Sequence, residues 1–200
     1  MSGKKIAFFD FDGTITIKDT LPEIIKFQKG VGAYYIGLLL YAPWLIAYKL
    51  KLFSNDKAKE KILIYFFSDT PEMVFQEKCN LFADRILPRL IRPDALREIN
   101  QLRMDGFEIA VISASAENWI RNWSDRYRLK LIATKLEVKN GLITGRIEGR
   151  NCYGAQKVVC IHEQWNLTEY EDIYVYGDTS GDKPMLALAT KSFYKPFRTA

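Results

Sequence analysis

A short apolar run that ends in two acids places the strongest constraint on how this chain folds. Residues 6–9, Ile-Ala-Phe-Phe, are apolar and aromatic without a helical period, which is typical of a short buried strand. Asp10 and Asp12 follow at once, and Gly13-Thr14 then ends the run. Because charge at a buried strand end is costly unless a cation or a reaction uses it, the pattern predicts a functional site there.

The second half of the chain alternates helices with strands. Periodicity and turn signals predict helices over 93–104, 116–127, 154–165 and 183–189, strands over 107–115, 129–134 and the beginning of 172–182, and a hairpin over 136–149 turned at Asn140-Gly141. This alternation predicts an α/β fold with a Rossmann-like, doubly wound parallel sheet and helices on both faces. Ligands bind outside the carboxyl ends of such strands, where Asp10, Asp12, Ser113 and Asp178 stand. We therefore expect these four side chains at one edge of the sheet.

Composition narrows the functional classes. The 200 residues suffice for one core with a small insertion, and 48% hydrophobic and 26% charged residues are ordinary for a globular protein. The net charge of +5 favours anionic substrates or membrane surfaces, but no basic run or aromatic–basic repeat indicates nucleic-acid binding. The start of the chain has no signal-peptide pattern, and Cys79, Cys152 and Cys160 lack metal-ligand spacing. We expect a cytoplasmic protein with reduced thiols.

The polar residues of the predicted sheet edge suit phosphoryl transfer. Carboxylate oxygens bind a hard cation such as Mg²⁺, and the candidate acids are Asp10, Asp12, Asp178 and Asp182. Lys157 offers a point charge for phosphate, Ser113 a hydroxyl, and the loop amides after Asp12 further donors. Positioning and charge neutralisation dominate phosphoryl transfer, and a carboxylate nucleophile forms an aspartyl-phosphate.

Four motifs occur in order along nearly the whole chain. They are "DFDGT" at 10–14, "ISAS" at 112–115, Lys157 in "GAQK", and "GDTSGD" at 177–182. Together they resemble the haloacid dehalogenase (HAD) superfamily of phosphohydrolases. The segment 17–92 has a helical pattern throughout and is similar to the C1 cap of the phosphoserine-phosphatase-like branch, subfamily IB. The resemblance implies a catalytic core formed by 1–16 and 93–200, with a helical cap, 17–92, inserted after the first motif.

The resemblance also implies a role for each matching residue. Asp10 would attack phosphorus, and Asp12 would protonate the leaving oxygen and then activate water. Mg²⁺ would bind Asp10, Asp178 and the backbone carbonyl of Asp12. The phosphoryl oxygens would be held by Ser113, Lys157, Gly13 and Ala114, with Asp182 orienting Lys157 and Thr14 in support. An acid at Asp12 favours a phosphatase, because the dehalogenases of the superfamily lack it and the ATPases carry a Thr there.

Each of these residues also has a plainer interpretation. Asp10 and Asp12 could simply begin a polar loop. Ser113 could cap the following helix. Asp182 could form a surface pair with Lys183, or it could bind the metal directly.

The run 30–48 contains nineteen residues without a charge, close to the ~20 that span a bilayer. A single crossing would separate Asp10 from Ser113, Lys157 and Asp178, so we exclude it. The run is then either a buried cap helix or a hydrophobic face laid on, or dipped into, one leaflet of a membrane. Pro43 fits a bend or a break of the helix in either case. Lysines follow it at positions 49, 51, 57, 59 and 61, which favours peripheral contact with an anionic inner membrane face.

The cap bears on the substrate because it covers the leaving group in this family. Asp19 stands seven residues after Asp12, where phosphoserine phosphatases carry a Glu that meets the substrate ammonium. We expect a Mg²⁺-dependent phosphomonoester hydrolase acting on a small polar phosphate such as phosphoserine. The cap also resembles phosphatidylglycerophosphatase C, so a lipid phosphate at the membrane is the alternative. A non-catalytic binding module on the same scaffold is an alternative of another class.

Overall fold

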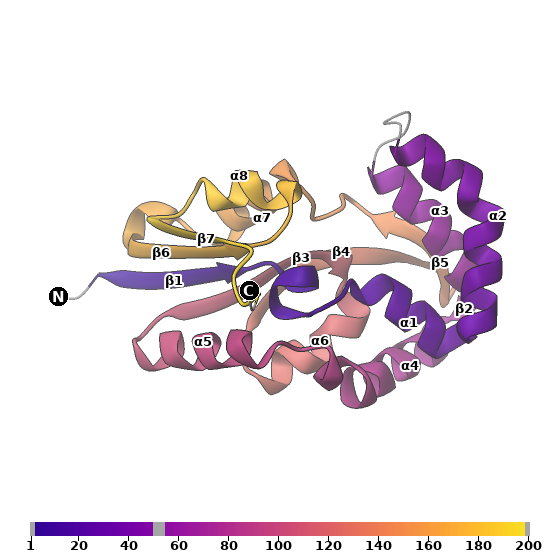
Figure 1. The fold of residues 1–200 in the computed structure, drawn as a ribbon, viewed down its shortest axis with the longest axis horizontal. Coiled ribbons are helices and arrows are strands. Elements are labelled where there is room, and N and C mark those ends of the chain that lie inside the picture. The colour runs from indigo at the N-terminus through magenta and orange to yellow at the C-terminus, as the bar shows by residue number, and fades with distance from the viewer. Residues whose placement is uncertain (1–2, 50–54, 199–200) are drawn as a thin grey trace.

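A seven-stranded sheet forms the middle of the molecule in a computed structural model, which describes residues 3–49 and 55–198 (Figure 1). In order along the sheet, the strands are β2 (Thr70–Pro71), β5 (Leu142–Glu148), β4 (Lys130–Lys139), β3 (Glu108–Ala116), β1 (Lys4–Phe9), β6 (Tyr170–Gly177) and β7 (Lys191–Tyr194). Strands β4, β3, β1, β6 and β7 run parallel, and β5 and β2 add antiparallel strands beyond β4. The predicted α/β class with a doubly wound parallel sheet is confirmed.

The register of β1 aligns the strand ends that carry the predicted site. Phe9, the last residue of β1, lies opposite Val111 of β3 and Tyr176 of β6. Asp10 therefore comes one residue after this aligned trio, and Ser113 and Asp178 come two residues after it. Parallel pairing puts all three at the same edge.

Helices cover both faces of the sheet. One face carries α5 (Pro93–Met104) and α6 (Glu117–Arg126), and the other carries α7 (Ala155–Gln164) and α8 (Lys183–Leu186) (Figure 1). Successive side chains of a strand point to opposite faces. Phe8 accordingly packs in one core with Ile161 of α7, and Phe9 packs in the other with Trp119 and Trp123 of α6. Two apolar layers thus fix β1, and with it the position of Asp10.

Several boundaries differ from the sequence prediction. The strand at 129–134 and the first arm of the hairpin form one strand, β4, which pairs with β3 through its first half and with β5 through its second. The turn itself is as predicted, since Asn140 and Gly141 have positive φ angles of 52° and 74°. Helix α8 ends at Leu186 rather than 189. The mostly exposed edge strand β7 was not predicted, because four residues show too little periodicity.

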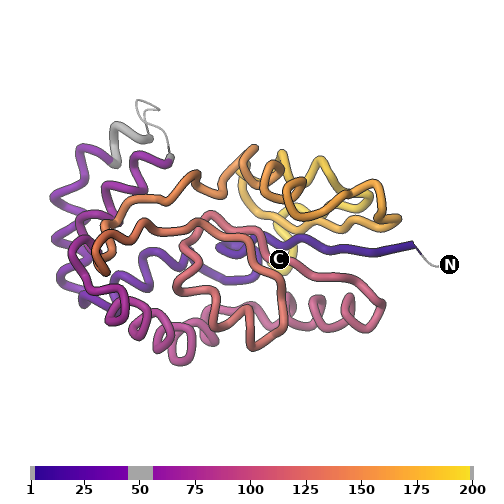
Figure 2. Tube along the Cα trace, turned by 180° about the vertical axis from the view of Figure 1, so that it is seen from behind, coloured from indigo at the N-terminus to yellow at the C-terminus, as the bar shows by residue number. Residues whose placement is uncertain are grey.

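The helices of segment 17–92 gather at one end of the molecule (Figures 1 and 2). They are α1 (Thr20–Lys29), α2 (Val31–Lys49), α3 (Asn55–Phe67) and α4 (Glu72–Arg85). The prediction of helix throughout is wrong at Thr70–Pro71, because the free edge of β5 pairs with this short stretch as β2. Gly145 of β5 has a φ of 77°, and a Cβ there would lie 2.4 Å from the Cα of Ile64. Helix α3 therefore packs directly against the backbone of strand β5.

The uncharged run forms α2, which continues through Pro43 without the predicted break. Large apolar side chains of this helix are exposed, with Leu39 76% and Val31 57% accessible. The exposed set is Val31, Tyr35, Ile36, Leu39, Leu40 and Trp44. Helix α2 is therefore buried on one face only, since Tyr34, Gly37, Leu38 and Tyr41 line a cavity inside the cap. Side chains 45–49 and Lys51 lie outside the described residues. Among the described helices, none combines the length and the apolar character that a membrane crossing requires.

Candidate active site

A cavity of about 560 Å³ opens where the carboxyl ends of β1, β3 and β6 face helices α1 and α3. Asp10, Asp12 and Gly13 line it from the end of β1, and Asp178 lines it from the end of β6. Lys157 reaches it from the first turn of α7. The structure thus brings together residues that are as many as 168 positions apart in the sequence (10 to 178).

Lys157 lies at the floor of this cavity between two acids. Its Nζ donates to Asp10 Oδ1 at 2.5 Å and to Asp182 Oδ1 at 2.7 Å, and its side chain is buried. Burial alone would lower the pKa of Lys157, but the two carboxylates outweigh it and raise that pKa. Burial would raise the pKa of Asp182, but the positive charge of Lys157 outweighs burial, so the pKa of Asp182 is lowered. The lysine therefore stays charged, and the interpretation of Asp182 as a surface partner of Lys183 is wrong.

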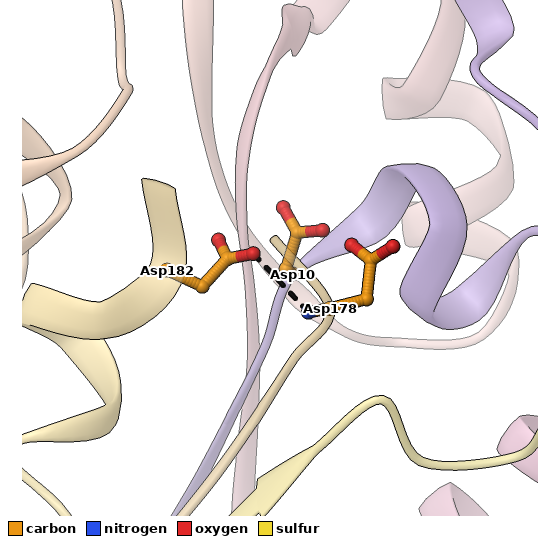
Figure 3. A group of neighbouring side chains, drawn as sticks. All are labelled: Asp10, Asp178 and Asp182. Carbon is orange, nitrogen blue, oxygen red and sulfur yellow. Dashed lines mark hydrogen bonds between the residues drawn. The ribbon is translucent and has the colours of Figure 1, made fainter. Parts of the chain in front are cut away.

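Three carboxylates form a cluster beside this lysine (Figure 3). Asp10, Asp178 and Asp182 each offer an oxygen within 4.8 Å of the others. Asp182 turns its second oxygen, Oδ2, to the backbone amides of Asp178 and Thr179, at 3.2 Å and 2.9 Å. The carboxylate of Asp182 thus joins Lys157 to the backbone that follows β6.

The donor set of this cluster fits a divalent metal. Mainly because of burial, the pKa of Asp10 is raised to about 7, and that of Asp178 is also raised. Hard carboxylate oxygens suit Mg²⁺, which needs few of them and keeps several waters. The guanidinium of Arg198 also contacts this cluster, where Nη2 donates to Asp178 Oδ2 at 2.6 Å. Thr14, predicted as a supporting residue, donates its hydroxyl to Asp10 Oδ2 at 3.2 Å.

Asp12 occupies a separate position between the sheet and the cap. Its carboxylate accepts from the Ser115 hydroxyl at 2.5 Å and from the Thr20 amide, the first residue of α1, at 2.7 Å. Burial raises the pKa of Asp12 to about 6. A carboxyl group with a pKa near neutrality can both donate and accept a proton at physiological pH.

The predicted phosphate-binding residues lie at different depths. Gly13 and Ala114 line the cavity, whereas Ser113 is fully buried beneath it and its hydroxyl accepts from the Ser115 amide at 3.0 Å. Gly13 has a φ of 79°, and a Cβ there would lie 2.4 Å from Asp178 Oδ2, so the turn requires glycine. Ser113 does not cap the next helix, because α6 begins after Ala116 without a side-chain cap.

Sequence reasoning missed three cations that line the cavity, Lys18, Lys59 and Arg198. Lys59 of α3 donates its Nζ to the Ala114 carbonyl and to Asn151 Oδ1, and so ties the cap to the end of β3 and to the loop after β5. Burial lowers the pKa of Lys59 to about 8. In the sequence, Lys59 is one of five lysines that follow the uncharged run, and nothing in its spacing distinguishes it. Ser115 could have been found, because it belongs to the second motif.

The family described as haloacid dehalogenase-like hydrolase matches residues 7–187, a span that includes every one of the acids above. The chain belongs to this family. It is 31% identical over 192 residues to protein CicA of Caulobacter vibrioides, covering 95% of this chain and 85% of that protein. It is 23% identical over 194 residues to a phosphoserine phosphatase of Archaeoglobus fulgidus, covering 93% of this chain and 51% of that protein.

A solved structure from Bordetella pertussis Tohama I, a protein of unknown function, shares the fold of this HAD hydrolase. The TM-score is 0.83 at 20% identity, over 96% of this chain and 89% of that chain. The predicted membership of the HAD family and the predicted hydrolase class are confirmed.

Proposed function

We propose that this HAD hydrolase is a Mg²⁺-dependent phosphomonoester phosphatase that acts through an aspartyl-phosphate. The observation that carries the proposal is the arrangement of Asp10, which lies between Lys157 and Asp178 on the floor of a cavity. The core would consist of 1–16 and 93–200 and the cap of 17–92, of which residues 1–2, 50–54 and 199–200 lie outside the described residues.

Asp10 and Asp12 would carry out the two chemical steps of the reaction. A carboxylate oxygen of Asp10 attacks phosphorus, the bond from phosphorus to the leaving oxygen breaks, and Asp12 gives its proton to that oxygen. Asp12 then takes a proton from water, whose oxygen attacks phosphorus and releases Asp10. The raised pKa of Asp12, about 6, suits a group that must act first as an acid and then as a base.

The surrounding residues position and neutralise the phosphoryl group. Lys157 supplies positive charge beside the attacking oxygen, and Asp182 holds Lys157 in place. The backbone around Gly13 and Ala114 lines the cavity, and Ser113 supports the loop from below. Mg²⁺, held by Asp10, Asp178 and the backbone carbonyl of Asp12, would supply charge neutralisation at the phosphoryl oxygens.

The first substrate candidate is a small polar phosphate such as phosphoserine. Asp19 lines the same cavity, and its carboxylate accepts from the Leu21 amide at the start of α1. An acid in this position suits a leaving group that carries an ammonium. The Archaeoglobus fulgidus relative, named a phosphoserine phosphatase, supports this choice.

Phosphate release from phosphoserine, with Mg²⁺ and then with a chelator, tests the proposal. We expect Mg²⁺-dependent release that Asp10→Asn abolishes without unfolding the protein. Asp125→Asn, at an exposed site on α6, is the matched control and should keep full activity. Activity retained by Asp10→Asn would refute the mechanism. No Mg²⁺-dependent release from a broad panel of phosphomonoesters would favour the non-catalytic binding module.

The second substrate candidate is a lipid phosphate, and the exposed apolar face of α2 favours it. Monomeric proteins rarely expose contiguous apolar patches larger than a few hundred Å², and Lys57, exposed on α3, would complement anionic headgroups. Release from phosphatidylglycerophosphate in mixed micelles should then exceed release from phosphoserine. Sedimentation with phosphatidylglycerol vesicles should also be lost in Leu39→Glu and kept in Met73→Glu, whose site on α4 is 84% exposed.

A further inference from the structure

A second cavity lies beside the catalytic one, inside the cap. Its volume is about 170 Å³, and helices α1, α2 and α3 enclose it. Ile25 lines it from α1, Leu38 and Tyr41 from α2, and Phe66 from α3. Asp19 is the one charged residue of its lining. Apart from that acid, the wall is aliphatic and aromatic.

The two cavities adjoin each other on the side of the leaving group. Asp19, Leu21 and Ile62 line both of them. Asp12, the proposed donor to the leaving oxygen, contacts the amide of Thr20 in the same turn. A group that extends from phosphorus past Asp12 therefore meets Asp19 first and the apolar cavity next.

The size and lining of the second cavity define what it can hold. An engineered apolar cavity of about 150 Å³ in another protein stays dry and binds benzene. A cavity of about 170 Å³ therefore takes one aromatic ring or an alkyl segment of a few carbons. The side chain of serine, which is short and polar, would leave it empty.

The helix packing shows that this cavity is already formed. Gly37 of α2 meets α3 so closely that a Cβ would lie 2.3 Å from Cζ of Phe66. The ring of Tyr41 packs on that of Tyr65, with 5.0 Å between the ring centres, and Lys26 Nζ lies 4.9 Å from the ring centre of Tyr34. These contacts hold α1, α2 and α3 around the space, as expected of a ligand subsite.

We propose that this cavity is a subsite for an apolar segment of the substrate's leaving group, with Asp19 at its entrance. The inference rests on the proposed phosphatase function and extends it to the class of leaving group. The substrate would be an amphiphilic phosphomonoester: phosphate, then a polar or cationic portion facing Asp19, then an alkyl or aromatic portion.

A series of n-alkyl phosphates tests the subsite without any mutation. Each buried methylene contributes up to about fourfold in affinity, so kcat/KM should rise at least about tenfold from ethyl to hexyl phosphate. Equal kcat/KM for the two esters would overturn the inference. A plateau beyond hexyl would identify a small ligand, whereas a further rise with dodecyl phosphate, below its micelle concentration, would identify a lipid chain.

Filling the cavity should remove this preference. Leu38→Trp places a large ring in the space and should bring the hexyl-to-ethyl ratio of kcat/KM close to one. Met73→Trp makes a similar change at an exposed cap position and should keep the wild-type ratio. A Leu38→Trp enzyme that retains the wild-type ratio would overturn the inference.

Binding separates this inference from the proposed function. Hexylphosphonate and ethylphosphonate cannot be hydrolysed, and calorimetric titration in Mg²⁺ compares their affinities directly. Tighter binding of hexylphosphonate by at least about tenfold supports the subsite even if no ester is hydrolysed, in which case the proposed function alone fails. Equal affinities overturn the subsite, whatever the enzyme hydrolyses.

Discussion

The sheet edge at the carboxyl ends of the strands buries charged side chains, whereas the outer face of α2 exposes apolar ones. At the sheet edge, the acids Asp10 and Asp182 are buried, and Lys157 contacts both. On α2, large apolar side chains such as Leu39 and Leu40 face solvent. Buried charge is costly unless paired, whereas an exposed leucine costs little in a single molecule.

The two regions differ in whether their side chains find interaction partners elsewhere in the same chain. The buried charges find their partners in other segments, because Lys157 of α7 and Asp182 after β6 converge on Asp10. On the outer face of α2, Leu39 and Leu40 stay mostly exposed, and Lys61 of α3 lies over the ring of Trp44, 3.9 Å from its centre. We infer that the first region is completed within the chain, and that the second is a surface that the proposed lipid contact would cover.

The largest effect is expected where the buried network loses its cation. Lys157→Met leaves Asp10 and Asp182 buried without their shared partner and should lower the free energy of unfolding by about 3–5 kcal/mol. Denaturant titration without Mg²⁺ measures this change. Lys4→Met, which breaks an exposed pair with Glu169, is the control and should leave the free energy of unfolding nearly unchanged. Equal losses in the two variants would mean that the buried network contributes no more than a surface pair.

A smaller effect is expected where the cap helix α3 rests on the sheet. Gly145→Ala would push a Cβ into the backbone of Ile64 and should destabilise the protein by about 1–3 kcal/mol more than Gly149→Ala. Both glycines have φ near 76°, but Gly149 has open space around it, so the pair isolates the contact from backbone strain. Thermal unfolding of both variants gives the comparison, and equal midpoints would contradict the close packing.

Arg198 should have a modest effect, on metal affinity rather than on stability. The side chain of Arg198 is 44% exposed, and its guanidinium donates to Asp178, a proposed Mg²⁺ ligand, so it competes with the metal for that oxygen. Arg198→Gln should tighten Mg²⁺ binding about two- to fivefold, as measured by calorimetric titration. Arg97→Gln, in an exposed pair with Asp94, should leave the affinity unchanged. Weaker binding in Arg198→Gln would mean that Arg198 helps to form the metal site.

The smallest effect is expected on the outer face of α2. Leu39→Gln changes an exposed side chain and should alter the free energy of unfolding by no more than about 0.5 kcal/mol. Denaturant titration at low protein concentration measures it. A loss above 2 kcal/mol would show that Leu39 is buried in solution, by a second molecule or by another part of the chain.

The sequence alone was sufficient where chemistry and local pattern coincide. The apolar run before Asp10 predicted β1, the pair Asn140-Gly141 predicted the turn between β4 and β5, and the order of four motifs predicted the HAD family. Each of these signals lies within a few neighbouring residues, because strand periodicity, turn preferences and loop motifs are local properties.

Only the tertiary structure decided which distant residues meet and which faces stay exposed. It placed Lys59 against the end of β3, Arg198 against Asp178, and an apolar cavity beside Asp19. It also left one face of α2 exposed over the described side chains 31–44, although the sequence pattern was equally compatible with a buried helix. The physical reason is that hydrophobicity sets the free energy of burying a side chain, whereas the packing of other segments decides whether anything covers it.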